Sequence, residues 1–405
     1  MDFFTKIDIP AAHWQIDYNS RVAFFGSCFA DNISAQFKTR KFKILANPFG
    51  TVYNPLSIAM QIKAIANGKK FGDPEVFQDM RPDITRDSAP WHCWDAHGSL
   101  SAATREECIA QLDKATIQAR DFLQKADVVF ITLGTAFVYF LKGSGVAVSN
   151  CHRQNPNLFI RKMISVDHVA EALKSIVRDL QKIKCDWIAS PGSHASLGAS
   201  AARNDEQDYT AREPAHALGN RSSYDQQSYV SQRERRELHI VFTVSPLRHL
   251  SDGAHENTLS KATLQLAIEK VMREIATAPA EFRDDNSRTV PNTATTVSYS
   301  PSYEIVMDEL RDYRFYDSDM IHLSKTAEEY IFERMAETYC SKETREDIHK
   351  VEKFMKMANH RIVNSQIPAS REFIQKFLAQ ATELENQIAG LDLSAERQRF
   401  ANIEI

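Results

Sequence analysis

Two nucleophile-type side chains, Ser27 and Cys28, stand next to each other in the stretch RVAFFGSCFADNISAQF. A short apolar run and Gly26 precede them, which predicts a strand that ends in a sharp turn. A helix is expected directly after the turn, because apolar residues recur there at every fourth position. Unpaired N–H groups at the start of a helix favour a developing negative charge, so either side chain could act as a nucleophile. Otherwise Ser27 caps the helix and Cys28 is a small buried apolar residue.

A second reactive pair, Asp319 and His322, lies in the stretch YDSDMIHLSKTAEEY, just ahead of another predicted helix. An aspartate three residues before a histidine can accept a hydrogen bond from the imidazole and fix its tautomer. The other ring nitrogen is then free to take a proton from a nucleophile. The alternative is an ordinary surface pair ahead of a helix.

Metal-ligating residue types gather in the stretch WHCWDAHGS, which contains His92, Cys93, Asp95 and His97. No second pair of residues with metal-ligand spacing is evident elsewhere. We therefore favour a substrate-facing loop, with His97 or Trp94 on the wall of a pocket, over a metal site.

Polar residues also follow the predicted strand that ends before SPLRHLSDGAHENTLSK. Arg248, His249 and Asn257 should therefore lie at the same edge of the sheet as Ser27 and Cys28. They are expected to bind a polar or anionic substrate, unless they only satisfy one another at the start of a helix.

Composition narrows the class of protein. The chain has 405 residues, 43% of them hydrophobic and 25% charged, and its net charge of −4 gives no reason to expect binding to nucleic acid or to a membrane. Its six cysteines include no CxxC pair, and no apolar run approaches the roughly 20 residues of a spanning helix. We expect a cytoplasmic protein that requires no metal or cofactor. The sequence leaves its oligomeric state open.

Apolar runs that alternate with helical patterns predict an α/β fold with a mostly parallel sheet. Strands are expected at residues 22–25, 42–46, 127–134, 238–246 and near 297. Two helix stripes should cover the sheet, one formed by Val169, Leu173, Ile176, Leu180 and Ile183, and the other by Leu259, Thr263, Leu266 and Ile275. Residues 191–236 are polar and predict a flexible insertion. Residues 341–405 predict a helical extension of an α/β domain at 1–340.

Several sequence blocks resemble a known family. The stretch FFGSCFADNI carries the five letters that name the GSCFA family, and the blocks NPFGTVYNP, TLGTAFVY, SPLRH, SYEIVMDELRDYRFY and DMIH follow in that family's order. The strand-turn nucleophile and the DxxH loop resemble the SGNH (GDSL-like) hydrolase superfamily. The resemblance implies a flavodoxin-like three-layer α/β/α domain with a serine-type esterase site.

The resemblance also implies roles for individual residues. Aligning Gly26 with the glycine of the superfamily's Gly-Asp-Ser turn makes Cys28 the nucleophile, whereas a slip of one residue gives that role to Ser27. His322 would be the base, oriented by Asp319. Gly50 matches one oxyanion-binding glycine. In the block that should supply an oxyanion-binding asparagine, this chain has Gly134 and Thr135, with Ala136 at the place of the asparagine. The Thr135 hydroxyl or the Asn54 amide could substitute for it.

Together these patterns predict an acyl esterase or O-acyltransferase that acts on a small-molecule or carbohydrate ester. The missing asparagine favours the alternative, a non-catalytic ligand-binding or scaffold protein on the same fold.

Overall fold

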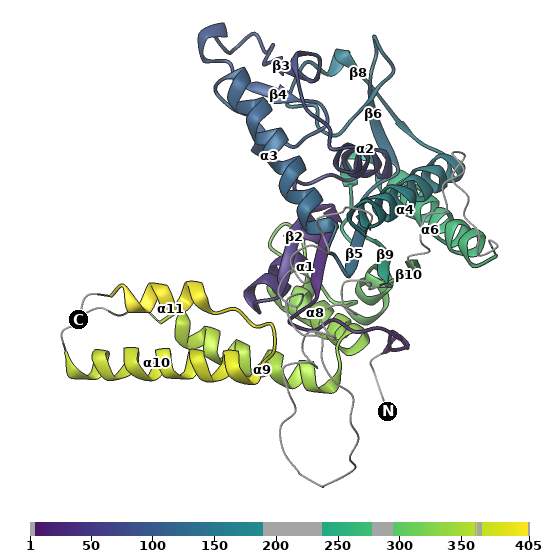
Figure 1. The fold of residues 1–405 in the computed structure, drawn as a ribbon. Coiled ribbons are helices and arrows are strands. Elements are labelled where there is room, and N and C mark those ends of the chain that lie inside the picture. The colour runs from purple at the N-terminus through teal and green to yellow at the C-terminus, as the bar shows by residue number, and fades with distance from the viewer. Residues whose placement is uncertain (1–4, 189–236, 278–294, 361, 363–366, 404–405) are drawn as a thin grey trace, which may run out of the picture.

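The computed structural model describes residues 5–188, 237–277, 295–360, 362 and 367–403 (Figure 1). The predicted insertion at 191–236 lies outside these residues. In the part of the chain that the model describes, no helix is long and apolar enough to cross a membrane.

A five-stranded parallel sheet forms the centre of the fold, with the strand order β10-β9-β5-β1-β2. All five predicted strands are confirmed, and they are β1 (Arg21–Gly26), β2 (Lys43–Ala46), β5 (Val128–Leu133), β9 (Leu238–Val244) and β10 (Thr295–Tyr299). Their apolar runs are continuous because both faces of the sheet are covered.

Two small antiparallel sheets, which the sequence analysis missed, stand beside the central sheet. Their strands are short, and several carry polar residues. They are β3 (Val76–Gln78), β4 (Trp91–Cys93), β6 (Phe137–Leu141), β7 (Ala147–Val148) and β8 (Phe159–Met163).

Helices cover both faces of the central sheet, which gives a three-layer α/β/α arrangement (Figure 1). One layer contains α2 (Pro55–Ala66), α3 (Arg105–Leu123), α4 (Val166–Ile188) and α6 (Ala254–Thr277). The other contains α1 (Cys28–Thr39), the single turn α7 (Ser302–Glu304) with the π-helical turn after it, and α8 (Lys325–Tyr339). Successive residues of β1 point to opposite layers, with Ala23 and Phe25 in one core and Val22 and Phe24 in the other.

Three helices follow the α/β part and extend from it in Figure 1: α9 (Lys342–Ala358), α10 (Pro368–Gln387) and α11 (Ser394–Ala401). Stacked rings of Phe377 and Phe400, with centroids 3.8 Å apart, join α10 to α11. Ion pairs from the end of α1 reach the extension, since Arg40 contacts Glu352 at 2.6 Å and Lys41 contacts Glu396.

The predicted stripe on α6 was wrong about the face that is buried. Leu259 and Leu266 are 43% and 60% exposed, whereas the buried face carries polar residues such as Ser260 and Lys261 beside Leu264. The stripe on α4 is confirmed, because all five of its predicted residues are buried. The buried polar face of α6 is directed to the ends of β5 and β9.

Candidate active site

The carboxyl ends of β1, β2, β5 and β9 meet at one edge of the sheet, as parallel strands require. The turn after β1 depends on Gly26, whose φ is +133° and whose added Cβ would lie 2.0 Å from the carbonyl oxygen of Thr132. Asn47 fixes this turn from the end of β2. Its Oδ1 accepts the Gly26 N–H at 2.8 Å, and its Nδ2 donates to the Gly26 carbonyl at 3.1 Å.

Ser27 occupies the N-cap position of α1, but its side chain makes no capping hydrogen bond. The residue is only 1% exposed, and its hydroxyl oxygen has no hydrogen-bond partner in the part of the chain that the structure describes. The interpretation of Ser27 as an ordinary helix cap was therefore wrong. A buried hydroxyl without a partner costs about 1–3 kcal/mol, so its presence asks for another explanation.

Cys28 is the first residue of α1 and is partly buried against the α8–α11 side of the protein. Burial raises the pKa of its thiol, and the negative charge of Asp31 raises it further. The backbone N–H groups of Phe29 and Cys28 and the charge of Lys261 lower this pKa, but by less. The sequence-based expectation that the helix start would leave this thiol with a lowered pKa was therefore wrong.

The raised pKa of the Cys28 thiol predicts how fast it is alkylated at each pH. Alkylation of Cys28 by iodoacetamide should be slow at neutral pH and should accelerate as the pH rises above the ordinary thiol range, because only the thiolate reacts. Asp31→Asn removes a nearby negative charge and should raise the rate at neutral pH. Peptide mapping by mass spectrometry separates Cys28 from the other thiols. A rate that is already maximal at neutral pH would contradict the raised pKa.

Asp31 joins the site to the loop after β2. Its carboxylate accepts hydrogen bonds from Asn47 Nδ2 at 2.7 Å and from the Thr51 hydroxyl at 2.6 Å. Asp31 was not among the residues predicted from the sequence, although it stands one helical turn after Ser27 on the same predicted helix.

The backbone donors predicted for an oxyanion hole are already paired. The Gly50 N–H donates to the Asn47 carbonyl at 2.7 Å. The N–H groups of Gly134 and Thr135 both donate to the Tyr53 carbonyl, at 2.8 and 3.0 Å. These three N–H groups hold the loops together in this structure. None of them is therefore available to bind an oxyanion, the role that was predicted for them.

The two side chains predicted to replace the missing asparagine are also engaged. Asn54 caps α2: its Oδ1 accepts the Ser57 N–H at 2.9 Å, and its Nδ2 donates to the Ser57 hydroxyl at 3.0 Å. The Thr135 hydroxyl lies 3.1 Å from the Ser260 hydroxyl and accepts the Phe137 N–H at 3.1 Å. Both side chains therefore have a structural task.

His249 lies next to Ser27, across Gly134. A Cβ placed on Gly134 would stand 3.3 Å from His249 Nε2 and 3.3 Å from Ser27 Cβ, so both side chains border the same small space. Like the Ser27 hydroxyl, His249 Nε2 is buried and has no hydrogen-bond partner within the described ranges. Burial lowers the pKa of His249 to about 4, and the charges of Lys261, Arg161 and His322 add to this effect. The imidazole is therefore neutral at pH 7.

Lys261 is a buried cation at the same edge, which the sequence analysis missed. Its ammonium group donates to the carbonyl oxygens of Gly134 and Ser245, at 2.5 and 2.7 Å, where β5 and β9 end. Burial lowers the pKa of Lys261 to about 7, and the charge of Cys28 opposes this shift. The only signal in the sequence is that Lys261 lies four residues after Asn257 on one helix face.

The Asp319–His322 pair has the predicted internal geometry. His322 Nδ1 lies 2.5 Å from Asp319 Oδ2, and the backbone N–H groups of Ile321 and His322 donate to Asp319 Oδ1. These bonds lower the pKa of Asp319 to about 2. Both side chains are about half exposed, and within the described chain His322 makes no hydrogen bond to Ser27 or Cys28. The prediction that His322 Nε2 reaches the nucleophile was wrong for this conformation.

The remaining predicted residues have different surroundings. Asn257 Oδ1 accepts the backbone N–H of His249 at 2.9 Å, and this bond fixes the loop that carries the imidazole. Arg248 is exposed, and its charge lowers the pKa of Tyr303 against the larger effect of burial. His97 packs against Gly50, and its Nδ1 accepts the Ser99 N–H at 3.2 Å.

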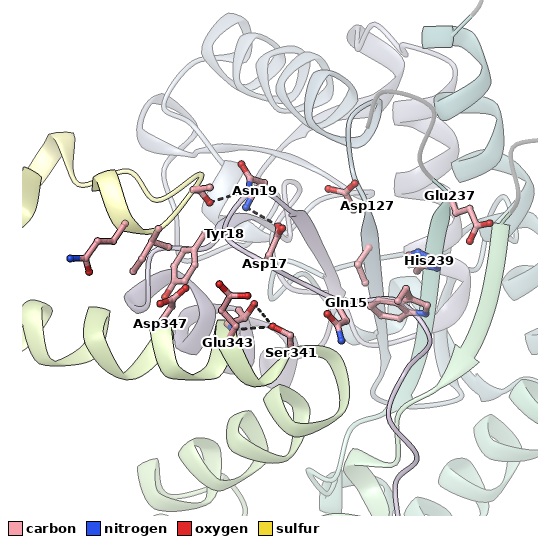
Figure 2. Close-up of a pocket in the computed structure, with 16 residues that line it drawn as sticks. Gln15, Asp17, Tyr18, Asn19, Asp127, Glu237, His239, Ser341, Glu343 and Asp347 are labelled. Carbon is pink, nitrogen blue, oxygen red and sulfur yellow. Dashed lines mark hydrogen bonds between the residues drawn. The ribbon is translucent and has the colours of Figure 1, made fainter. Parts of the chain in front are cut away.

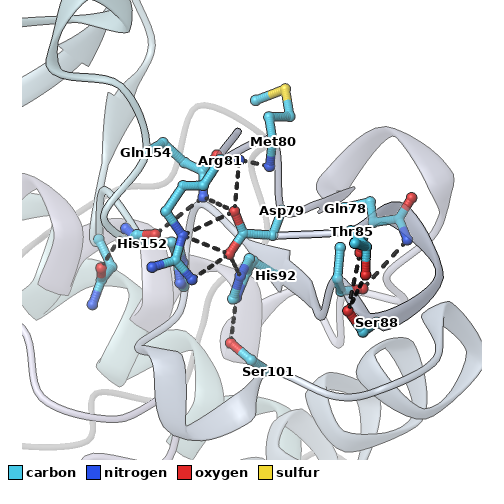
Figure 3. Close-up of polar contacts among 12 residues, drawn as sticks. Gln78, Asp79, Met80, Arg81, Thr85, Ser88, His92, Ser101, His152 and Gln154 are labelled. Carbon is cyan, nitrogen blue, oxygen red and sulfur yellow. Dashed lines mark hydrogen bonds and ion pairs between the residues drawn. The ribbon is translucent and has the colours of Figure 1, made fainter. Parts of the chain in front are cut away.

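The WHCWDAHGS stretch belongs to a buried polar network around Asp79 (Figure 3). His92 uses both ring nitrogens there, at 2.5 Å from the Ser101 hydroxyl and 3.2 Å from Asp79 Oδ2. Arg81 and Gln154 also donate to the Asp79 carboxylate. The hydrogen bonds from Arg81 and the other donors hold the pKa of Asp79 well below its usual range. His92 is thus a structural residue.

The hydrogen bonds around Asp79 are expected to stabilise the folded protein. Asp79→Asn should lower the free energy of unfolding by about 2 kcal/mol at pH 7, because the buried carboxylate and its ion pair with the partly exposed Arg81 are lost. A lowered pKa stabilises the fold above the ordinary aspartate pKa, and this contribution is lost as the pH falls. The difference between the variant and the wild type should therefore shrink below about pH 4. Urea denaturation at several pH values measures it, and Asp87→Asn, at an exposed position, is the control. Equal losses in both variants would contradict the role of the network.

Comparison with known proteins gives a family and no closer relative. No curated protein and no solved structure matches the chain. The family model described as "GSCFA family" matches residues 21–189 and 219–335. A second model, "GSCFA domain protein, C-terminal domain", matches residues 351–403. The first match contains Ser27, His249, Lys261 and the Asp319–His322 pair and spans more than half of the chain, so this protein belongs to the GSCFA family.

Proposed function

We propose that the protein is an acyl esterase or O-acyltransferase of the SGNH type that acts on a small-molecule or carbohydrate ester. The observation that carries this proposal is the Ser27 hydroxyl, which is buried at the end of β1 and has no hydrogen-bond partner among the described residues. A hydroxyl without a structural task, at the strand-to-helix turn where open α/β folds bind ligands, fits a nucleophile.

We assign the role of nucleophile to Ser27. Aligning Gly26 with the glycine of the Gly-Asp-Ser turn had favoured Cys28 instead. The raised pKa of the Cys28 thiol leaves little thiolate at pH 7. Ser27 instead shares its space beside Gly134 with an imidazole nitrogen. Because Ser27 is 1% exposed, the site must open before an ester can reach it.

In this proposal the Asp319–His322 pair supplies the base. Asp319 accepts a hydrogen bond from the Nδ1–H of His322 and stabilises the imidazolium that forms when His322 takes the Ser27 proton. His322 must approach Ser27 for this step, and the same opening that admits an ester can bring the exposed loop inward.

His249 takes the place of the missing oxyanion asparagine in this mechanism. Its imidazole is neutral at pH 7, and in the tautomer with the proton on Nε2 it can donate a hydrogen bond to the oxyanion without carrying a charge. The Ser27 oxygen attacks the ester carbonyl, the alkoxide leaves with the proton from His322, and water or a second hydroxyl then takes the acyl group from Ser27. Loss of one oxyanion donor typically lowers the rate by about a hundredfold or more.

A fluorophosphonate probe tests the proposal directly. The nucleophile displaces fluoride and keeps the phosphonyl group, and peptide mapping then identifies the modified residue. We expect the adduct on Ser27, and we expect His249→Ala and His322→Ala to slow its formation. An adduct on Cys28 would return the nucleophile to the thiol.

Two observations favour the alternative of a non-catalytic ligand-binding or scaffold protein. The predicted oxyanion N–H groups are paired, and His322 contacts neither candidate nucleophile in the described chain. This alternative predicts that no residue of the folded protein reacts with the probe. It also predicts no turnover of acetyl esters.

We also propose a cytoplasmic location. In the described part of the chain, Cys28, Cys93, Cys108, Cys151 and Cys340 form no disulfide bond, which suits a reducing compartment. Fractionation of cells with detection of the native protein tests this assignment.

A further inference from the structure

We propose that His13, Glu237 and His239 bind a divalent transition-metal ion at the edge of the sheet opposite to Ser27. One ligand atom from each residue lies within 4.8 Å of the other two. Zinc bound at about 2.1 Å would hold tetrahedral ligand atoms about 3.4 Å apart, so small side-chain rotations suffice to close the site. This inference does not depend on the proposed esterase activity.

Three parts of the fold bring these ligands together. His239 lies near the start of β9, and Glu237 comes just before that strand. His13 belongs to the N-terminal segment, which is tied to the end of α8 by hydrogen bonds from Ala12 and Ile16 to the carbonyls of Thr338 and Tyr339. These bonds are 2.9 and 2.7 Å long, so the segment that carries His13 has a defined place.

Trp14 holds His239 in position. Its ring stacks on His239 with centroids 4.4 Å apart, and its other contact is the Tyr339 ring at 5.0 Å. The rings of His13 and His239 meet edge to face with centroids 6.1 Å apart. A rigid aromatic neighbour of this kind reduces the entropy that a ligand residue loses when it binds an ion.

The Thr296 hydroxyl is bonded to Nδ1 of His239, so Nε2 is the ring nitrogen that would bind an ion. Nδ1 lies 2.7 Å from the Thr296 hydroxyl, on the neighbouring strand β10, where Thr296 pairs with His239 in register. Metal-ligating histidines usually hold their second nitrogen in this way.

A cavity of about 760 Å³ adjoins the site (Figure 2). Its described lining includes Glu237 and His239 together with the carboxyl groups of Asp17, Asp127, Glu343 and Asp347, and no lysine or arginine. This excess of carboxylates favours a cation, while the buried ammonium of Lys184, bonded to the Ala126 carbonyl at 2.8 Å, opposes it. Two histidines and one carboxylate leave a coordination position open, and the cavity offers room for a water molecule or small ligand there.

Titration of the EDTA-treated, dialysed full-length protein tests the site. We expect Co²⁺ to bind with one equivalent per chain and to give visible absorption bands, which Zn²⁺ then displaces. His13→Ala, Glu237→Gln and His239→Ala should each weaken Zn²⁺ binding by at least about a hundredfold, and Thr296→Val by about tenfold. His168→Ala, which removes an exposed histidine of α4, is the matched control.

Stoichiometric binding that is lost in the ligand variants and kept in His168→Ala supports the site. Absence of binding, or equal affinity in His13→Ala, Glu237→Gln and the wild type, overturns it. His13 and Glu237 are exposed, so these two variants keep the test decisive if His239→Ala fails to fold.

Discussion

Replacing Ser27 by alanine is expected to lower the rate of acyl-ester hydrolysis by at least about a thousandfold, because the covalent step loses its nucleophile. Cys28→Ala should keep most of the activity, since the raised pKa of this thiol gives it no place in the step at pH 7. Initial rates with p-nitrophenyl acetate measure both variants. A loss in Cys28→Ala with full activity in Ser27→Ala would reverse the assignment, and activity too low to detect in the wild type would favour the non-catalytic alternative.

Ser27→Ala should also have a characteristic effect on the free energy of unfolding. A capping serine contributes about 1 kcal/mol, whereas the Ser27 hydroxyl makes no capping bond and is buried without a partner. Ser27→Ala should therefore leave the free energy of unfolding unchanged or raise it. Ser341→Ala is the matched control, because the Ser341 hydroxyl does cap α9 by accepting the Thr344 N–H at 3.0 Å, and its loss should destabilise the protein. Equal destabilisation of both variants would mean that Ser27 has a structural task.

Gly26→Ala is expected to be the most damaging single substitution for stability, at about 4 kcal/mol or more. The new Cβ would lie 2.0 Å from the Thr132 carbonyl oxygen and 2.8 Å from its carbon, and the residue would keep a φ of +133°. Both clashing atoms belong to the backbone of β5, which pairs in register with β1, so neither strand can move without breaking the sheet.

Thermal unfolding and the soluble yield measure this effect. Gly143→Ala is the control, because no atom lies within 4 Å of the position of its added Cβ, and it should stay within about 0.5 kcal/mol of the wild type. A Gly26→Ala protein with wild-type stability would show that the turn can relax, and the geometry assigned to Ser27 would then have to be revised.

The five strands of the central sheet were predictable from the sequence because their signal is local. Runs such as DVVFITLG are apolar at consecutive positions, and only a strand covered on both faces uses that many buried residues in so few positions. The turn after β1 was predictable for the same reason, since a glycine between an apolar run and a helical pattern needs no distant partner to be identified.

The buried face of α6 could not be predicted, because hydrophobicity does not determine it. Leu259 and Leu266 suggested the core side, but the ends of β5 and β9 present the carbonyls of Gly134 and Ser245, and Lys261 satisfies both. A buried lysine is favourable only where such acceptors meet it, and two strands and a helix have to pack before those acceptors exist. The small antiparallel sheets were missed because their strands of two to five residues carry little periodicity.

The sequence by itself determined that Ser27 and Cys28 stand at the carboxyl edge of the sheet, through the order of strand, glycine and helix. The spacing of Asp319 and His322 likewise allows the hydrogen bond that the structure contains. Only the tertiary structure decided what those groups can do. It left the Ser27 hydroxyl and His249 Nε2 without partners, and it raised the pKa of Cys28 through burial and Asp31. The burial, the electrostatic environment and the hydrogen-bond partners of a side chain depend on atoms from distant parts of the chain. They are therefore defined only once the chain is folded.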